Sequence, residues 1–194
     1  YYGVEPRLSL QYKLGANYAV RLGYNRNYQY LQLLQNDELA FSSLEAWVPA
    51  GPNIKPQYVD VLSFRVNRLL YKGNIGLEGY WKKMENQVEL IDHAQLILNP
   101  FIETQLRQGK GRAYGVELSI NQRIGNLSGS LLYSWSRSFR KINGINKGKE
   151  YVANFDIPHV LKSSLSYDLG RSIHFSGFYT IQTGRPLTYP MGFM

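Results

Sequence analysis

The chain has 194 residues, a net charge of +8 and no cysteine, which excludes disulfides and thiolate metal sites. Its 16 Tyr, 8 Phe, 3 Trp and 18 Gly suit strands that carry amphipathic aromatic residues at an interface. No segment reaches the roughly 18 apolar residues of a membrane-spanning helix, so any crossing of a membrane would be made by strands.

The positive charge is spread along the sequence. No run of about five or six like charges occurs, as a basic nucleic-acid-binding tail would contain. Lys and Arg residues occur at the ends of expected strands or in loops, where their side chains would lie in water or contact lipid phosphates. We therefore expect no nucleic acid among the partners. The cations in such places are Arg107, Lys110, Arg112, Arg137, Arg140, Lys141, Lys147 and Lys149.

A first hairpin is predicted near the start of the chain. Apolar and polar side chains alternate over 6–14 and again over 18–27, which is the two-residue period of a strand, and 15–17 supplies the turn. Each strand has about 9 to 10 residues, a length that crosses a bilayer when tilted.

A long connection follows over residues 28–56. Three prolines interrupt it, and its length is uncommon for a plain connection, which indicates a functional loop. Within it, Leu31, Leu33 and Leu34 are compatible with a short helical turn.

The same design then recurs to the end of the chain. The segment 109–125, GKGRAYGVELSINQRIG, is the clearest strand, because apolar and polar residues alternate from Tyr114 onward. The other predicted strands are 57–70, 75 onward toward 91, 127–140, 159–169 and 172–183, with short turns at 71–74, 125–126 and 170–171 and long loops at 92–111, 141–157 and from 184.

Short and long connections alternate, so all short turns lie at one end of the sheet and all long loops at the other. Soluble sandwiches usually have Greek-key crossings, whereas outer-membrane barrels have this arrangement, with apolar side chains toward lipid and polar ones toward the lumen. The sequence therefore predicts an all-β fold, an antiparallel up-and-down meander that is part of a transmembrane outer-membrane β-barrel. A wet lumen would also accommodate the charged residues of the predicted inner face, Arg21, Arg65, Glu78, Lys82, Glu117 and Lys162.

Several stretches resemble one protein family. GKGRAYGVEL at 109–118 is similar to the G-x-G-x-x-x-G-x-E motif that begins a strand in TonB-dependent outer-membrane receptors. Further stretches resemble segments of the same barrels in the same order, and together the matches cover nearly the whole chain. These stretches are PRLSLQYKLGANYAVRLGYNRNYQY at 6–30, NIKPQ at 53–57, EGYWKKMENQV at 78–88, FDIPHVLKSSLSY at 155–167 and QTGRPLTYP at 182–190.

The resemblance implies a barrel of about 22 strands plugged by an N-terminal globular domain. Residues 1–194 are then expected to form a late-middle part of that barrel with about eight strands. The plug domain, the TonB-contacting segment and the final strands are expected to lie outside this chain. The start at Tyr-Tyr-Gly lacks the features of a signal peptide, and we expect a mature, truncated or excised piece.

The resemblance also implies a function. Such a receptor lies in the outer membrane of a Gram-negative bacterium and imports a scarce nutrient, such as a ferric siderophore, cobalamin or an oligosaccharide, with energy from TonB. The implied partners are outer-membrane lipids and lipopolysaccharide, TonB through a part of the protein outside this chain, and the small-molecule or oligomeric nutrient. No enzymatic activity is implied.

No constellation of residues predicts covalent or metal chemistry. The glycines of 109–115 miss the G-x-G-x-x-G spacing by one residue, and no G-x-S-x-G segment occurs. His93, His159 and His174 are far apart in sequence, and an outer-membrane hydrolase would need Ser and His side by side. Asp156 is expected to hydrogen-bond to backbone where a strand begins. We predict no catalytic residue, no metal site and no cofactor.

The predicted nutrient contacts are the loop residues Tyr28, Tyr30, Trp47 and Arg112, because binding residues concentrate on loops held by a rigid scaffold. Loops of this size also serve as lids. Aromatic residues near strand ends are assigned instead to an interfacial girdle, in which the rings lie among acyl chains and the polar tips reach headgroups. The girdle residues are Tyr12, Tyr18, Tyr24, Tyr71, Tyr133, Trp135, Tyr167 and Tyr179.

A second class of function fits the same strands. A small β-barrel or a soluble β-domain would act as a ligand-binding or structural module and would bury its apolar face. In that case Leu8, Leu22, Leu118 and Phe175 would pack together inside a water-bathed globule, whereas in a membrane barrel they would point toward lipid.

Overall fold

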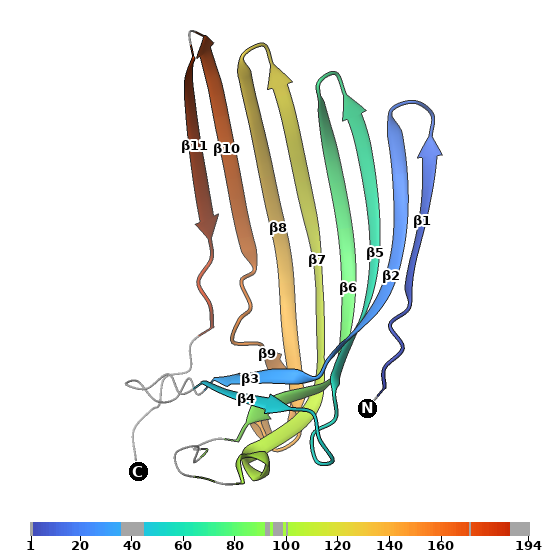
Figure 1. The fold of residues 1–194 in the computed structure, drawn as a ribbon, viewed down its shortest axis with the longest axis vertical. Coiled ribbons are helices and arrows are strands. Elements are labelled where there is room, and N and C mark those ends of the chain that lie inside the picture. Colours follow the sequence, from blue (N-terminus) through green and yellow to red (C-terminus); the bar gives the residue numbers. More distant parts are fainter. Residues whose placement is uncertain are drawn as a thin grey trace.

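The computed structural model describes residues 2–35, 45–91, 94, 99, 101–170 and 172–186. Within these residues one large antiparallel sheet accounts for most of the fold (Figure 1). Its strands are β1 (Arg7–Leu14), β2 (Tyr18–Gln29), β5 (Gln57–Leu70), β6 (Gly73–Leu90), β7 (Leu106–Ile124), β8 (Leu127–Ile142), β9 (Tyr151–Val152), β10 (His159–Gly170) and β11 (Ile173–Gln182). A separate hairpin consists of β3 (Leu31–Gln35) and β4 (Glu45–Pro49).

The long strands follow one another across the sheet in chain order. The spatial order is β1-β2-β5-β6-β7-β8-β10-β11, and the short β9 pairs with β8. Every pairing is antiparallel. The predicted up-and-down meander is therefore confirmed.

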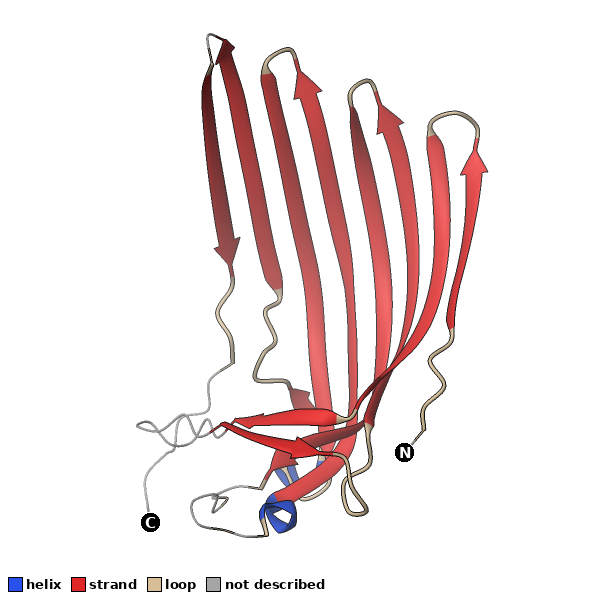
Figure 2. Ribbon diagram, in the orientation of Figure 1, coloured by secondary structure: helices blue, strands red, loops and turns tan. Residues whose placement is uncertain are grey.

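The two ends of the sheet differ as predicted. Tight turns lie at one end and the long connections at the other (Figure 2). Gly15 and Gly125 occupy turns at the first end with φ of 69° and 58°, a left-handed conformation that favours glycine because it has no Cβ. We refer to these as the turn end and the loop end.

Strand register separates the sheet into an apolar face and a polar face. One row across the strands reads Leu10, Leu22, Phe64, Gly79, Val116 and Trp135. The adjacent row reads Gln11, Arg21, Arg65, Glu78, Glu117 and Ser134. Because neighbouring residues of a strand point to opposite faces, the rows alternate between an oily surface and a polar one.

The apolar face is not covered by any of the described segments. Leu8 is 68% exposed, Leu22 is 46% exposed and Phe175 is 62% exposed, and none of them belongs to a buried cluster. A water-soluble β-domain would cover such a face. The arrangement therefore favours strands that meet lipid.

The loop end differs from the prediction over residues 28–56. Leu31, Leu33 and Leu34, which are also compatible with a helical turn, lie in the strand β3. In the register, Leu33 is opposite Trp47 and Leu31 is opposite Pro49 of β4. The partner strand lies more than ten residues away in sequence, and local helical spacing does not report such long-range pairing.

Two other loops are more ordered than predicted. β7 begins at Leu106, inside the loop expected at 92–111, because β6 and β7 continue to pair past a bulge at Asn86, whose φ is 56°. The loop expected at 141–157 contains a short 3-10 helix, η2 (Asn146–Gly148), and β9. A second such helix, η1 (Ile102–Gln105), precedes β7. Among the described residues, no helix is long and apolar enough to cross a membrane.

Charge insertion on the two faces gives a direct test of this orientation. Leu77 lies midway between the turn end and Trp81 on the apolar face, and Leu77→Arg should lower the free energy of unfolding by about 2–4 kcal/mol if that face meets acyl chains. The measurement is the urea midpoint of the protein folded into lipid vesicles.

Ser134→Arg is the matched control for Leu77→Arg. Ser134 lies on the polar face opposite Glu117 in the register, so a new guanidinium there meets water and a carboxylate. We expect a midpoint close to that of the original protein. Equal losses in both variants would contradict the assignment of the faces.

Candidate functional site

A hollow of about 470 Å³ lies on the polar face of the sheet, between β1 and β7. Most of its lining groups are hydroxyls, amides and charged side chains, so it suits water or a polar ligand. The lining residues are Arg7, Leu8, Ser9, Gly23, Tyr24, Asn25, Val61, Ser63, Glu78, Tyr80, Lys82 and Glu117.

Arg65 organises the polar groups next to this hollow. Its Nη1 donates to Glu78 Oε2 at 3.1 Å, and its Nε donates to Asn67 Oδ1 at 2.9 Å. Its Nη2 lies 3.4 Å from Ser119 Oγ. These contacts join three strands, and they form a hydrogen-bonded polar wall of the kind that lines a barrel lumen.

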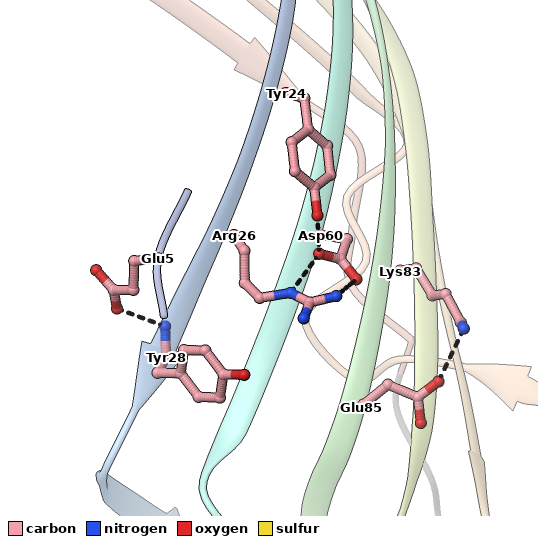
Figure 3. A network of polar contacts seen from close by, with 7 residues as sticks. All are labelled: Glu5, Tyr24, Arg26, Tyr28, Asp60, Lys83 and Glu85. Atoms are coloured by element: carbon pink, nitrogen blue, oxygen red, sulfur yellow. Dashed lines mark hydrogen bonds and ion pairs between the residues drawn. The ribbon is translucent and has the colours of Figure 1, made fainter. Parts of the chain in front are cut away.

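A second polar network lies on the other face, just beyond the aromatic residues that end the apolar surface toward the loops (Figure 3). Asp60 Oδ1 accepts from Tyr24 Oη at 2.8 Å and from Arg26 Nε at 2.7 Å. Asp60 Oδ2 accepts from Arg26 Nη2 at 2.8 Å. The guanidinium also lies 4.8 Å from the centre of the Tyr58 ring. Arg26 is thus held by a two-point ion pair and an aromatic face.

The ion pair changes the acidity of both partners. Hydrogen bonds from Arg26 hold the pKa of Asp60 below its usual value of 3.8, and burial opposes this effect. The hydrogen bond to Asp60 raises the pKa of Arg26. The pair therefore stays charged at neutral pH.

Arg112 lies in the same row as this pair. The register runs from Arg26 through Asp60 and Lys83 to Arg112. Arg112 donates from Nε to Glu150 Oε1 at 2.8 Å and from Nη2 to Glu150 Oε2 at 2.6 Å, and these hydrogen bonds raise the pKa of Arg112. The two-point contact fixes the segment before β9 against β7.

A small apolar core fixes the loop end. Leu34, Val48, Ile54, Val88 and Leu106 are buried together. They come from β3, β4, β6, β7 and the segment before β5. The core thus fastens the β3–β4 hairpin to the ends of the long strands.

Hydrogen bonds tie the segment before β5 to the same place. Asn53 Nδ2 donates to Glu103 Oε2 at 2.7 Å, and Asn86 Nδ2 donates to the backbone oxygen of Pro56 at 2.9 Å. Gln108 Nε2 donates to the backbone oxygen of Lys55 at 3.2 Å. Loop residues near this core are therefore positioned by a rigid scaffold.

The structure brings two of the four predicted nutrient contacts together. The rings of Tyr28 and Tyr30 stack with their centres 6.1 Å apart. The N-terminal segment lies against them, since a Cβ at Gly3 would meet both side chains, and the backbone N–H of Tyr28 donates to Glu5 at 2.8 Å (Figure 3). These tyrosines are partly covered by the chain itself.

Trp47 and Arg112 lie elsewhere. Trp47 is on β4 and is 61% exposed, beside the buried Val48 that anchors the hairpin. Arg112 is on β7, engaged by Glu150, and points to the face that carries Tyr114 and Trp135. Among the described residues, no recorded contact links Trp47 to Arg112 or to the tyrosine pair.

The histidines do not form a metal site within the described part of the chain, where no group of three or more His, Cys, Asp or Glu could hold an ion. His159 Nδ1 lies 2.8 Å from Tyr133 Oη, and His174 lies 3.6 Å from Asp168. Asp92 and His93 are outside the described residues. Asp156 accepts from the backbone N–H of Ser138 at 2.6 Å, which confirms its predicted backbone role.

The sequence reasoning missed the Arg26–Asp60 pair and the Glu150 contact. Arg26 follows Leu22 by four residues and Asp60 precedes Phe64 by four residues, so both continue the apolar face. A charged residue that interrupts an apolar row marks the place where a strand leaves the lipid. That signal is readable in the sequence, whereas Glu150 lies in a loop and gives no such signal.

The Arg26–Asp60 pair predicts a pH-dependent contribution to stability. Because the pKa of Asp60 is lowered in the folded protein, its carboxylate stabilises the fold above the usual value of 3.8, and this stabilisation is lost as the pH falls through the lower folded-state pKa. Asp60→Asn should lower the urea midpoint at pH 7, and the difference from the original protein should shrink toward pH 3.

Tyr24→Phe serves as the control for Asp60→Asn. It removes one hydrogen bond to Asp60 and leaves the ion pair, so its effect at pH 7 should be the smaller one. A difference between Asp60→Asn and the original protein that grows toward pH 3 would contradict this assignment.

The loop core predicts a local effect of Ile54→Ala. Ile54 is 2% exposed, and removing a buried Ile side chain costs about 2–5 kcal/mol. Limited proteolysis should cut the β3–β4 region faster while the urea midpoint of the sheet stays nearly constant. Leu31→Ala is the control, since Leu31 is 48% exposed. Equal cleavage of both variants would contradict the role of the core.

Comparison with known proteins agrees with this geometry. The family model described as TonB dependent receptor-like, beta-barrel matches residues 1–189. No curated protein matches the chain. The matched residues include all the strands of the sheet. Membrane β-barrels have an apolar outer face and a polar inner face, which agrees with the two faces of this sheet. The chain therefore belongs to the TonB-dependent receptor β-barrel family of the Gram-negative outer membrane, a family of transporters rather than enzymes.

Proposed function

We propose that this chain is part of the barrel wall of a receptor that binds a scarce nutrient at the cell surface and imports it with energy from TonB. The observation that carries the proposal is the two-faced sheet, because its apolar rows suit contact with lipid and the opposite row with Arg65, Glu78 and Glu117 suits a water-filled lumen. Short turns then lie in the periplasm and the long loops outside the cell.

The sheet edges support a partial barrel. Within the described residues, β1 and β11 each pair with one neighbour only, and all their residues whose exposure is described are exposed. Unpaired edges in a membrane must be closed by other strands, because no water is present to satisfy their backbone groups. Residues 1–194 are accordingly proposed to form about eight strands of a larger barrel, with the plug domain, the TonB-contacting segment and the final strands outside this chain.

Trp47 is the strongest of the proposed nutrient contacts. It is exposed on a hairpin whose other side is buried in the loop core, so its ring is available while its backbone is held in place. Exposed and rigidly held tryptophans suit the apolar surfaces of siderophores, corrins and sugar rings. Tyr28, Tyr30 and Arg112 remain proposed contacts, with Arg112 also holding Glu150.

The experiment compares uptake in three strains of the source organism: the original, a strain without the gene and a strain without TonB. Each strain is grown under limitation on ferric siderophores, cobalamin or oligosaccharides as the only supply. We expect one nutrient class for which loss of the gene and loss of TonB abolish growth alike. Unchanged growth without the gene on every class would contradict the proposed import.

Variants at Trp47 then test the contact on the nutrient so identified. Trp47→Ala should raise the concentration needed for half-maximal uptake by about tenfold or more, because exposed tryptophans in binding surfaces often dominate affinity. Trp47→Phe keeps an apolar ring and should retain most of the affinity. Equal affinity in the original protein and Trp47→Ala would exclude Trp47 and leave the transport function itself intact.

A further inference from the structure

A second hollow, of about 330 Å³, lies at the turn end of the sheet. It spans β6, β7, β8 and β10, and its side chains are cationic, amide or hydroxyl groups. None of the described residues that line it is acidic. Its cations are Lys72 and Arg123, and its serines are Ser128, Ser130, Ser164 and Ser166. We call it the turn-end hollow.

The strand register places the cations and two of the serines in one row. Arg123 of β7 is opposite Ser128 of β8, which is opposite Ser166 of β10. The backbone N–H of Arg123 donates to the backbone oxygen of Lys72 at 3.0 Å, so the two cations are neighbours across the strands. Arg123 follows Glu117 by six residues, and an even spacing keeps both on the polar face.

The adjacent row toward the loop end adds neutral hydrogen-bond donors. Ser130 is opposite Ser164, and their Oγ atoms lie 2.7 Å apart. One hydroxyl hydrogen makes this bond, which leaves the other free to donate to an anion. Asn121 lies in the same row, where its Nδ2 donates to Asn74 Oδ1 at 2.9 Å. The turn-end hollow therefore combines two cations with hydroxyl and amide groups.

Within the described part of the chain, the two cations have no recorded carboxylate partner. Arg123 Nε donates to the backbone oxygen of Gly125 at 3.4 Å, and no acceptor is recorded for its Nη groups. The Lys72 ammonium lies 5.2 Å from the centre of the neighbouring Tyr71 ring. Like charges opposite each other on adjacent strands destabilise a sheet. An anion between the two cations would remove that repulsion.

The acidic residues of the surrounding strands lie outside the turn-end hollow. β7, β8 and β10 contain two, Glu117 and Asp168, and neither lines it. Glu117 is about 20 Å from Arg123 along the strand, at about 3.3 Å per residue. Asp168 accepts from the backbone N–H of Gly170 at 2.8 Å and lies 3.6 Å from His174. The positive charge of the hollow is therefore left for another anion.

The backbone at Lys72 gives a second reason to assign a role to this cation. Tyr71 and Lys72 form the turn between Leu70 and Gly73, which are opposite each other in the register. The φ of Lys72 is 58°, in the left-handed region, where glycine and asparagine are favoured over lysine. Lys72 therefore occupies its position at a conformational cost, and such costs are typical of functional sites.

We propose that the turn-end hollow is an anion subsite on the lumen wall, which binds carboxylate or phosphate groups of the imported nutrient. The oxygens of such a group can accept hydrogen bonds from Arg123, Lys72 and the serine hydroxyls. With the turns in the periplasm, the subsite lies on the exit side of the barrel, at the opposite end from Trp47. The proposal rests on the proposed transport function and narrows its nutrient to anionic compounds.

The binding test uses the full receptor, purified in a neutral detergent. The probes are inorganic phosphate and citrate, with glucose as the uncharged comparison, and line broadening in the NMR spectrum of each probe measures binding. We expect both anions to bind and glucose not to bind. Added sodium chloride should weaken binding of the anions, because salt screens exposed charges. Absence of binding by both anions would contradict the proposal.

Variants at Arg123 test the location of the subsite. R123Q should weaken phosphate binding by about tenfold, the loss expected for a hydrogen bond between charged groups, whereas R123K keeps the charge and should retain most of the affinity. K13Q is the charge-matched control, since Lys13 lies on the polar face of β1, three strands from β6. Equal losses in R123Q and K13Q would show that net charge rather than the turn-end hollow attracts the anion, and would overturn the proposal.

The variant K72N separates anion binding from folding. Asparagine tolerates the left-handed conformation, so the urea midpoint in lipid vesicles should be no lower than that of the original protein. Phosphate affinity should fall by about fivefold, the Coulomb contribution expected for one exposed charge near another. A lower midpoint with unchanged phosphate affinity would contradict the assigned role of Lys72.

Uptake of the nutrient identified by the growth experiment distinguishes this proposal from the transport function. R123Q should lower the maximal rate of uptake while the half-saturating concentration, set by contacts at the loop end, stays constant. A nutrient without carboxylate or phosphate groups would overturn the anion subsite and leave the transport function intact. Unchanged growth without the gene contradicts import whatever the binding test gives, so the two failures are distinguishable.

Discussion

The structure depends on strands that keep lipid on one side and water on the other. In a sheet the side chains alternate between faces, so one residue of register slip would exchange every member of the row from Leu22 to Trp135 with the row from Arg21 to Ser134. Arg65 secures that register from the polar side, because it bonds to groups on its own strand, on β6 and on β7. The tight turns at Gly15 and Gly125 fix it from the turn end.

The loop end follows a different physical rule. There the strands leave the membrane, and side chains must find partners in water or in a core of their own. The buried cluster around Ile54 and Leu34 is such a core. It packs part of the long connection against the sheet as the β3–β4 hairpin, on which Trp47 is exposed. Because β6 and β7 run from the polar wall into this core, buried contacts join the β3–β4 hairpin to the long strands of the sheet.

Between these regions lies a band of charge at the boundary of the apolar face. Arg26 with Asp60 and Arg112 with Glu150 are matched pairs, and Glu85 contacts both Lys83 and Lys110. Side chains of this length place ammonium and guanidinium groups among headgroups while their stems remain near the acyl chains. The band thus marks the boundary at which the apolar rows of the strands end.

The sequence by itself determined the strands, their faces and the two unlike ends, because a two-residue period and turn residues such as Gly125 are local properties. It also placed Arg65, Glu78 and Glu117 on the polar face, because successive side chains of a strand point to opposite faces of the sheet. Only the tertiary structure decided the β3–β4 hairpin, the contact of Arg112 with Glu150 and the facing of Lys110 by Lys141. These features join residues far apart in the chain, and long-range pairing and burial, rather than local pattern, set them.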